Sequence, residues 1–461
     1  MAKFNPVSEA VLAELTAVLP PDQISTAEAE RQLRAQDMSQ HDAHLSEVVV
    51  WPSSSQQVAD VLRIAHANHI PVTPWGAGSS LEGNSIPLFG GITLSLERMN
   101  QIVALHADDF QVTVQPGIGY KDLNKALGPH GLFFAPDPGA NASIGGMLGN
   151  NAAGSRTVKY GATKDNILAM EVVLADGRLI HVGSRSVKQS AGYDLLHLFV
   201  GSEGTLGIVT QATLKLVPLP DVMSGVVANF TSVESAITAV VDLRASGLDI
   251  AALEFVDAAT ADLLSREEGV DWGDNPTLLM EVHAAHAETA ELDLALVQEI
   301  CAAHGAIRFQ ATTDTAERQK MWRTRHLMFE TMRRVFVGYR WQLSDMAVPI
   351  SQYPALVQFA RQALQSRNLP QFMVGHAGDG NLHITTPYQD EATRQQANQA
   401  NEDVVRKAIE LGGTSTGEHG VGIGKAKFMV EEHGETAVTV MRQLKQTLDP
   451  HGILNPGKIL P

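Results

Sequence analysis

Two histidines flank a glycine-rich turn in the segment FMVGHAGDGNLHITT, and imidazoles held together at such a turn can bind a metal ion. His376 and His383 are seven residues apart, so on one straight strand they would point to opposite faces. If the turn folds residues 372–376 back against residues 382–386, the two imidazoles become approximate cross-strand neighbours and can share an ion. The alternative is a polar hairpin with two solvated histidines, and spacing alone leaves both interpretations open.

A second polar cluster places Glu418 and His419 side by side in the glycine-rich stretch GGTSTGEHGVGIGK. Imidazoles combined with a carboxylate suit a borderline divalent ion such as Zn²⁺, Mn²⁺ or Fe²⁺. Three protein ligands leave coordination positions open for a substrate, which is typical of a catalytic rather than a structural site. Taken alone, a Glu-His pair in such a loop is most often only a turn.

The segment MWRTRHLMF carries Arg323, Arg325 and His326 on a predicted helix. The planar fork of an arginine can hold a carboxylate through two parallel hydrogen bonds. Helical arginines usually face solvent, so the residues alone favour a surface role.

Three glycine-rich loops precede these segments: PWGAGSSLEGNS, PDPGANASIGGMLGNNAAGS and GSEGTLGIVT. Glycines let backbone N–H groups approach an anion closely. The first loop is neither a dinucleotide fingerprint, because Leu81 stands where a third glycine is needed, nor a P-loop, because Asn84 follows Gly83 in place of lysine. One such loop would be an ordinary turn, but three together favour a cofactor site.

The elements that must position these residues follow from the hydrophobic pattern. A strand at VVVWP, a helix over SSSQQVADVLRIAHANH and a strand entering the first glycine loop predict a βαβ-like opening. Further strands are predicted at residues 91–96, 110–114 and 170–174 and in GIVTQATLKLVPLP, which ends near Pro220.

Beyond Pro220 the order changes to a strand at GVVANF, a helix from a Thr231/Glu234 capping box to Ser246, strands at EFV and TLLMEVHA, a helix near residues 288–304 and a strand at AIRFQATT. This order predicts an α+β sheet similar to the ferredoxin-like split βαβ arrangement. We therefore expect an N-terminal helical segment (residues 1–41), a first domain (42–220), a second domain (221–427) and a C-terminal helix with an extended tail (428–461).

Composition narrows the function classes. The 461 residues carry a formal net charge of −17, which argues against nucleic acid as a partner. The single cysteine, Cys301, excludes a thiolate metal cluster within one chain. No apolar run has the length of a membrane span and the N-terminus lacks a signal-peptide pattern, so we expect a cytoplasmic protein, with peripheral contact to the inner membrane left open.

The motifs PWGAGSSLEG, PDPGANASIGGM, KYGATKDNI, GYDLLHLFVGSEGTLGIVT and LKQTLDPHGILNPGKIL together resemble the vanillyl-alcohol oxidase (PCMH-type) FAD superfamily, over nearly the whole chain from about residue 42. The resemblance implies an α+β protein with a PCMH-type FAD-binding domain, a ferredoxin-like substrate (cap) domain and a C-terminal segment that returns to the flavin. It implies the following FAD-binding residues: Pro74, Gly76, Ala77, Gly78, Ser79 and Ser80 at the diphosphate, Pro136, Asp137, Ser143, Gly146, Asn150, Gly154 and Ser155 at the flavin and ribityl chain, Glu203, Gly207 and Ile208 at the adenosine, and Asn455 at the isoalloxazine. Ser79 and its neighbours offer no histidine or cysteine for a covalent tether, so we expect non-covalent FAD.

The polar clusters of the second half are similar to the metal site of FAD-dependent D-2-hydroxyacid dehydrogenases. By that resemblance His376, His383 and Glu418 are ligands of a divalent metal (Zn, or Mn or Fe), and His419 is the general base that takes the hydroxyl proton while a hydride leaves for flavin N5. The resemblance also selects Arg325, with Arg323 as a bystander, to hold the substrate carboxylate.

The segments LSDMAVPISQYPALV and TSTGEHGVGIGKAKFMVEEHG look closest to the D-lactate dehydrogenase (acceptor or cytochrome type) branch, also near the glycolate oxidase flavoprotein subunit. Relatives that use D-2-hydroxyglutarate carry a basic residue and a hydroxyl where Leu343 and Phe329 stand here, which ranks D-lactate first, glycolate second and D-2-hydroxyglutarate third. The partners expected are a small 2-hydroxyacid, an electron acceptor (a quinone, a cytochrome or an electron-transfer protein) and a second copy of the chain in a homodimer. The competing hypotheses are a non-catalytic FAD-binding subunit of a larger oxidase and a metal-independent oxidase.

Overall fold

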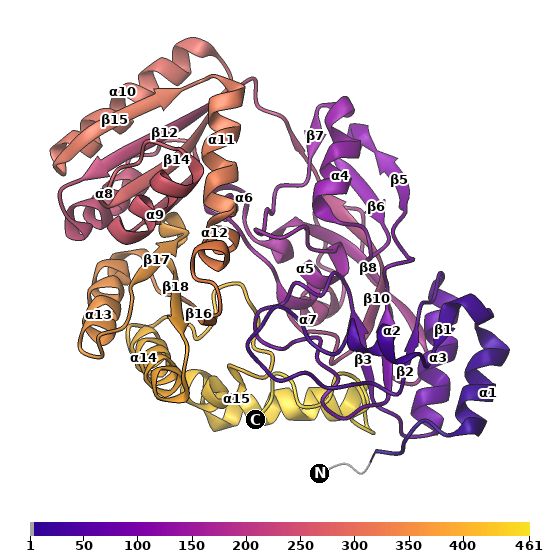
Figure 1. Cartoon of the computed structure of the whole chain (residues 1–461). Coiled ribbons are helices and arrows are strands. Elements are labelled where there is room, and N and C mark those ends of the chain that lie inside the picture. The colour runs from indigo at the N-terminus through magenta and orange to yellow at the C-terminus, as the bar shows by residue number, and fades with distance from the viewer. Residues whose placement is uncertain (1–3) are drawn as a thin grey trace. The chain divides into compact units, whose positions relative to one another are not determined.

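The computed structural model describes residues 4–461, which form two compact units. Of the described residues, unit 1 comprises residues 4–153, Ala162–Leu219 and Glu418–Pro461, and unit 2 comprises Gly154–Gly161 and Pro220–Gly417. Figure 1 labels the elements of both units. Each unit therefore combines segments that are distant in the sequence, and each is described by itself below.

The first sheet of unit 1 has the strand order β1-β2-β4-β3. Its strands are β1 (Ile24–Ser25), β2 (Val48–Val50), β4 (Ile92–Ser95) and β3 (Val72–Trp75), and β2, β4 and β3 run parallel. Helix α3 (Ser55–Ala67) connects β2 to β3 and begins where the Ser54 hydroxyl accepts from the Gln57 amide. Its buried residues Val58, Val61 and Leu62 belong to the same core as the strands and α1 (Glu9–Val18). The predicted βαβ opening is confirmed.

The second sheet of unit 1 is antiparallel with the order β5-β6-β10-β8-β9. Its strands are β5 (Ile102–His106), β6 (Gln111–Val114), β10 (Ile208–Lys215), β8 (Ile167–Val173) and β9 (Leu179–Gly183), and a small ladder joins β7 (Leu132–Phe133) to β11 (Val217–Pro218). The remaining helices of this unit are α2 (Glu28–Gln32), α4 (Tyr120–Leu127), α5 (Ile144–Asn150), α7 (Leu195–Phe199) and α15 (Met429–Leu448). Glycine loops connect these elements, so the two sheets, whose central strands belong to buried cores, hold the loops in place.

Unit 2 is built on a seven-stranded sheet with the order β15-β12-β14-β13-β17-β18-β16. Its first part runs β12 (Val222–Phe230), α8 (Val233–Ala245), β13 (Ile250–Val256), α9 (Ala258–Glu268), β14 (Thr277–Ala284), α10 (Ala287–Ala303) and β15 (Ala306–Thr312). With these four strands numbered in chain order, their spatial order is 4-1-3-2, which confirms the predicted split βαβ arrangement. The predicted Thr231 cap is wrong by one residue, because the Ser232 hydroxyl accepts from the Ser235 amide.

The second part of unit 2 extends this sheet with strands that carry the candidate site. It contains α11 (Thr315–His326), α12 (Met328–Val335), β16 (Arg340–Ala347), α13 (Tyr353–Gln365), β17 (Phe372–Gly375), β18 (Asn381–Tyr388) and α14 (Glu391–Glu410). The short helix α6 (Thr157–Tyr160) packs against β13. Among the described residues, no helix combines the length and apolar character that crossing a bilayer requires.

Candidate functional site

The glycine loops of unit 1 enclose a cavity of about 670 Å³, part of it open to solvent. Nine of the predicted FAD-binding residues line it: Pro74, Gly76, Ser80, Ser143, Gly146, Asn150, Glu203, Gly207 and Ile208. The three loops thus meet around one space.

Other predicted FAD-binding residues do not line this cavity in the described part of the chain: Ala77, Gly78, Ser79, Pro136, Asp137, Gly154, Ser155 and Asn455. Gly154 and Ser155 belong to the short unit 2 segment. Asn455 is buried, and its amide donates to the backbone oxygens of Asn84 (2.9 Å) and Glu203 (2.7 Å). Sequence reasoning missed several lining residues within the same loops: Trp75, Asn84, Ser85, Gly145, Gly149 and Ser202.

The close packing of these loops fits a flat anionic cofactor. A Cβ on Gly76 would lie 2.3 Å from the Ser143 hydroxyl, so a larger residue there would force this hydroxyl out of its present position. The Ser143 hydroxyl in turn accepts from the Gly146 amide at 3.3 Å, which fixes the start of α5. The cavity wall combines glycine backbone and polar side chains such as Asn84 and Asn150 with apolar side chains such as Trp75, Leu96 and Phe199, a mixture that is common in cofactor pockets.

The backbone of the predicted base is anchored within unit 1. The Asn150 amide donates to the His419 carbonyl oxygen at 3.2 Å. The Glu203 carboxylate accepts from the Val421 amide at 2.6 Å and from the Gly422 amide at 3.0 and 3.2 Å. Because Asn150 and Glu203 also line the cavity, the loop that follows His419 is attached directly to the cavity wall.

In unit 2, Arg325 is the first of three buried side chains that are connected by hydrogen bonds and ion pairs. It projects from the same face of α11 as Met321, which packs into the core, whereas Arg323 is exposed. The Arg325 Nε and Nη2 atoms donate to Glu254 Oε2 at 2.9 and 2.8 Å, and the other oxygen of Glu254 contacts His376 Nδ1. Arg325 and His376 are thereby joined through one carboxylate.

The charge on Glu254 is stabilised by its partners. Burial alone would raise the pKa of Glu254, but the charges of His376 and Arg325 outweigh this effect and lower the pKa to about 2. An ionised carboxylate only accepts hydrogen bonds, so His376 Nδ1 carries a proton, and a metal would bind Nε2 in place of the proton there. Carboxylate-histidine pairs of this kind orient metal ligands in proteins.

Strand pairing places the second histidine on the same face of the sheet as Glu254. Residues two apart on a strand and residues directly opposite across strands share a face. Val256 lies two residues from Glu254 and pairs with Val374, Val374 pairs with His383, and His383 pairs with Asp345. The predicted folding of residues 372–376 back against residues 382–386 is therefore confirmed, with the His376 and His383 ring centroids 5.1 Å apart.

The Asp345 carboxylate contacts His383 and the residues around it. Its carboxylate lies 3.6 Å from His383 Nδ1 and accepts from the Asn381 side chain (2.7 Å), the Thr416 hydroxyl (2.9 Å) and the Gly417 amide (2.7 Å). Glu418 and His419 directly follow Gly417, so peptide geometry keeps them close to this anchored end.

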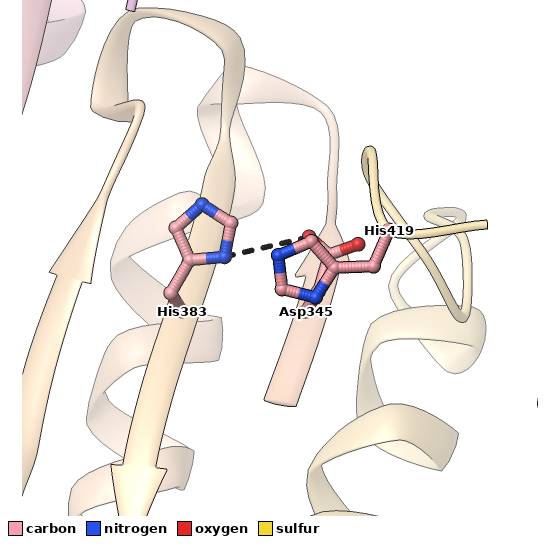
Figure 2. A group of neighbouring side chains, drawn as sticks. All are labelled: Asp345, His383 and His419. Carbon is pink, nitrogen blue, oxygen red and sulfur yellow. Dashed lines mark ion pairs between the residues drawn. The ribbon is translucent and has the colours of Figure 1, made fainter. Parts of the chain in front are cut away.

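Two groups of potential metal ligands result. One consists of His376, His383 and Glu418, and the other of Asp345, His383 and His419 (Figure 2). Within each group the ligand atoms lie within 4.8 Å of one another. Figure 2 also marks the ion pair between His383 and Asp345. Imidazole nitrogens and carboxylate oxygens at this spacing fit a divalent ion such as Zn²⁺, Mn²⁺ or Fe²⁺.

Glu254 and Asp345 are functional candidates that sequence reasoning missed. A signal existed for Glu254, because a carboxylate inside the apolar strand IAALEFV has to be buried with a partner. Asp345 lies in the mixed polar and apolar strand RWQLSDMA, so its complete burial is visible only in the structure. Their partners come from distant segments and are visible only in the fold.

Comparison with known proteins identifies the family to which the chain belongs. The family described as FAD linked oxidases, C-terminal domain, matches residues 219–459, and the FAD binding domain matches residues 46–183. The chain is 38% identical over 457 residues to the probable mitochondrial D-lactate dehydrogenase of Danio rerio, covering 98% of this chain and 92% of that protein. It is 34% identical to glycolate oxidase subunit GlcD of Bacillus subtilis, covering 98% and 97%.

The solved structure of p-cresol methylhydroxylase with substrate bound shares the fold, with a TM-score of 0.80 at 16% identity, covering 98% of this chain and 96% of that one. The mixed α+β architecture with a PCMH-type FAD-binding fold is thus established. Together with the family match over more than half of the chain, it shows that the protein belongs to the FAD-linked oxidases and is an FAD-binding oxidoreductase.

Proposed function

We propose that this protein oxidises a small D-2-hydroxyacid, with D-lactate to pyruvate as the preferred reaction. The main observation behind the proposal is that the buried side chains of Arg325, Glu254 and His376 are hydrogen-bonded in series, on the sheet face that also holds His383. It combines a carboxylate-binding group with oriented imidazoles, the two functions that a hydroxyacid requires. The names of the relatives, D-lactate dehydrogenase and glycolate oxidase subunit, support the same class.

Each residue has a defined role in this proposal. Arg325 already uses Nε and Nη2 on Glu254, so the substrate carboxylate would bind through the Nη1–Nη2 edge. A divalent ion held by His376, His383 and Glu418 would lower the pKa of the substrate hydroxyl. His419 would take the hydroxyl proton as general base. FAD, when bound, supplies the hydride acceptor.

The side-chain pocket of the substrate is apolar in this proposal. Leu343 lies two residues from Asp345 on β16, so both point to the face that holds His383. Trp341 shares this face, and its ring contacts Phe329 edge-on with a centroid distance of 5.8 Å. These groups provide no partner for a second carboxylate, which supports D-lactate over D-2-hydroxyglutarate.

Glycolate is the second candidate substrate, favoured by the similarity of this chain to a glycolate oxidase subunit. The electrons would pass on to a quinone, a cytochrome or an electron-transfer protein. A non-catalytic FAD-binding subunit is disfavoured because the arginine, the imidazoles and the carboxylates of a hydroxyacid site are all present.

Steady-state kinetics on D-lactate, glycolate and D-2-hydroxyglutarate with an artificial dye acceptor tests this proposal. We expect the highest kcat/KM for D-lactate. A tenfold preference for the dicarboxylate, about 1.4 kcal/mol in the transition state, would refute the assignment of the apolar wall. Absence of turnover with all three acids would refute the proposed function itself.

A further inference from the structure

The loop that carries the predicted base is wrapped around a buried carboxylate. Glu203 is only 5% exposed, and its two oxygens accept three contacts from the Val421 and Gly422 amides. Gly420 and Gly422 have φ values of +81° and +48°, a backbone conformation that favours glycine. Successive amides of such a loop converge on an anion, so the shape of residues 420–422 depends on the Glu203 side chain.

The surroundings of Glu203 leave the loop little freedom. A Cβ on Gly420 would lie 2.7 Å from Asn84 Nδ2 and 2.8 Å from Glu203 Oε1, so the loop backbone rests directly on these side chains. The Ile423 amide donates to the Glu82 carbonyl oxygen at 2.8 Å, just beyond the glycines. Burial raises the pKa of Glu203, and the amides of Gly422 and Val421 and the Asn84 side chain oppose that shift.

Glu203 is itself held in place by two other segments of unit 1. Its amide donates to the Gly149 carbonyl oxygen at 2.9 Å, and its carbonyl oxygen accepts from Asn455 at 2.7 Å. Glu203 adopts a left-handed backbone conformation with φ of +51°, which is uncommon for a residue with a side chain. Such strain persists only where the surrounding structure over-determines it.

We propose that Glu203 is a positioning residue for His419: its buried carboxylate holds residues 420–422 against the wall of the FAD cavity and thereby sets where the imidazole of His419 points. This inference rests on the proposed function, because it gives Glu203 the role of positioning His419, the general base of that reaction. It differs from a role at the adenosine, since both carboxylate oxygens are used on the loop amides.

The test replaces Glu203→Gln, which keeps the size of the side chain but turns one acceptor into a donor that faces a loop amide. We expect the holoenzyme to retain FAD, hydrogen exchange of the residue 419–423 amides to accelerate at least about tenfold, and kcat to fall at least about tenfold with KM changed less than twofold. Glu203→Asp keeps the charge but is one methylene shorter, and we expect smaller changes in the same direction.

Glu171→Gln is the matched control. Glu171 also lies in unit 1 and accepts from the Ser55 and Thr210 hydroxyls, but it does not line the cavity within the described chain. We expect it to leave both kcat and the exchange of residues 419–423 unchanged.

Three outcomes would overturn the inference. The Glu203→Gln variant could show wild-type hydrogen exchange in residues 419–423, or it could keep the wild-type kcat. The control Glu171→Gln could also show the same effects as Glu203→Gln. If Glu203→Gln fails to fold or loses FAD, the same readouts on Glu203→Asp decide. Hydrogen exchange is measured without substrate, so it remains informative if no hydroxyacid is turned over, an outcome that would refute the proposed function instead.

Discussion

Replacing Glu254→Gln removes the charge that joins Arg325 to His376. The glutamine has nearly the same volume, so the substitution leaves no cavity. It retains one acceptor oxygen, but its amide nitrogen then faces either the guanidinium or the imidazole N–H. The variant therefore isolates the charge of a side chain that is fully buried.

Two routes give the size of the effect on stability. Removing one partner from a buried ion pair costs about 3–5 kcal/mol, because the remaining charge is left uncompensated. The pKa of about 2, against 4.5 for an unperturbed glutamate, corresponds to about 3 kcal/mol at 1.36 kcal/mol per pH unit. Because the folded pKa is lowered, this contribution is present above pH 4.5 and is lost as the pH falls toward 2. Both routes predict a loss of about 3 kcal/mol at pH 7 in metal-free buffer.

Glu281→Gln is the matched comparison. Glu281 is also buried in unit 2, with a pKa lowered to about 2, since the charge of Arg156 and a bond from His283 outweigh its burial. Urea unfolding should show similar destabilisation of the two variants. Only Glu254→Gln should also weaken metal binding, by about 10–100-fold, since His376 loses the carboxylate that orients it. Equal metal affinity in both variants would refute the reasoning about His376.

Three further predictions concern other parts of the molecule. Burial raises the pKa of Asp257 to about 6 despite its hydrogen bonds to Thr260, so the folded protein loses stability as the pH rises from 3.8 to about 6. Asp257→Asn keeps the helix cap and should stabilise the protein by about 3 kcal/mol at pH 7.5 and by almost nothing below pH 3.8. Thermal unfolding at the two pH values would show this difference. When the denatured protein is filtered, all of the flavin absorbance should pass into the filtrate. Flavin absorbance that stays with the protein would contradict non-covalent FAD. Leu343→Lys should raise kcat/KM for D-2-hydroxyglutarate relative to D-lactate by about tenfold, and an unchanged ratio would remove Leu343 from the substrate wall.

Local sequence patterns predicted much of the fold. Alternating apolar residues and serine caps identified the helix α3 and the strands around it, and the order of elements after Pro220 predicted the split βαβ sheet. The exact cap at Ser232 was missed because Thr231 and Ser232 offer equivalent hydroxyls, and only the backbone conformation selects one. The extension of this sheet by three strands was not predicted, since it depends on pairing between β13 and β17.

The candidate site was predictable only in part. The Gly-Asp-Gly turn suggested that His376 and His383 meet, and the register of β17 and β18 confirms this. Glu254, which joins Arg325 to His376, lies 71 and 122 residues from them in the chain, so no local pattern could pair them. Glu203 belonged to a predicted cofactor loop, but its bonds to residues 421 and 422 depend on long-range packing.

The most direct test of the proposed metal-assisted oxidation is an anaerobic titration of the holoenzyme with D-lactate, followed by flavin absorbance before chelation, after chelation and after Zn²⁺ or Mn²⁺ is returned. We expect rapid bleaching, a decrease in its rate of at least about a hundredfold after the metal is removed, and recovery when it is restored. Bleaching at the same rate in the chelated enzyme would contradict a role for His376, His383 and Glu418 as ligands of a catalytic metal.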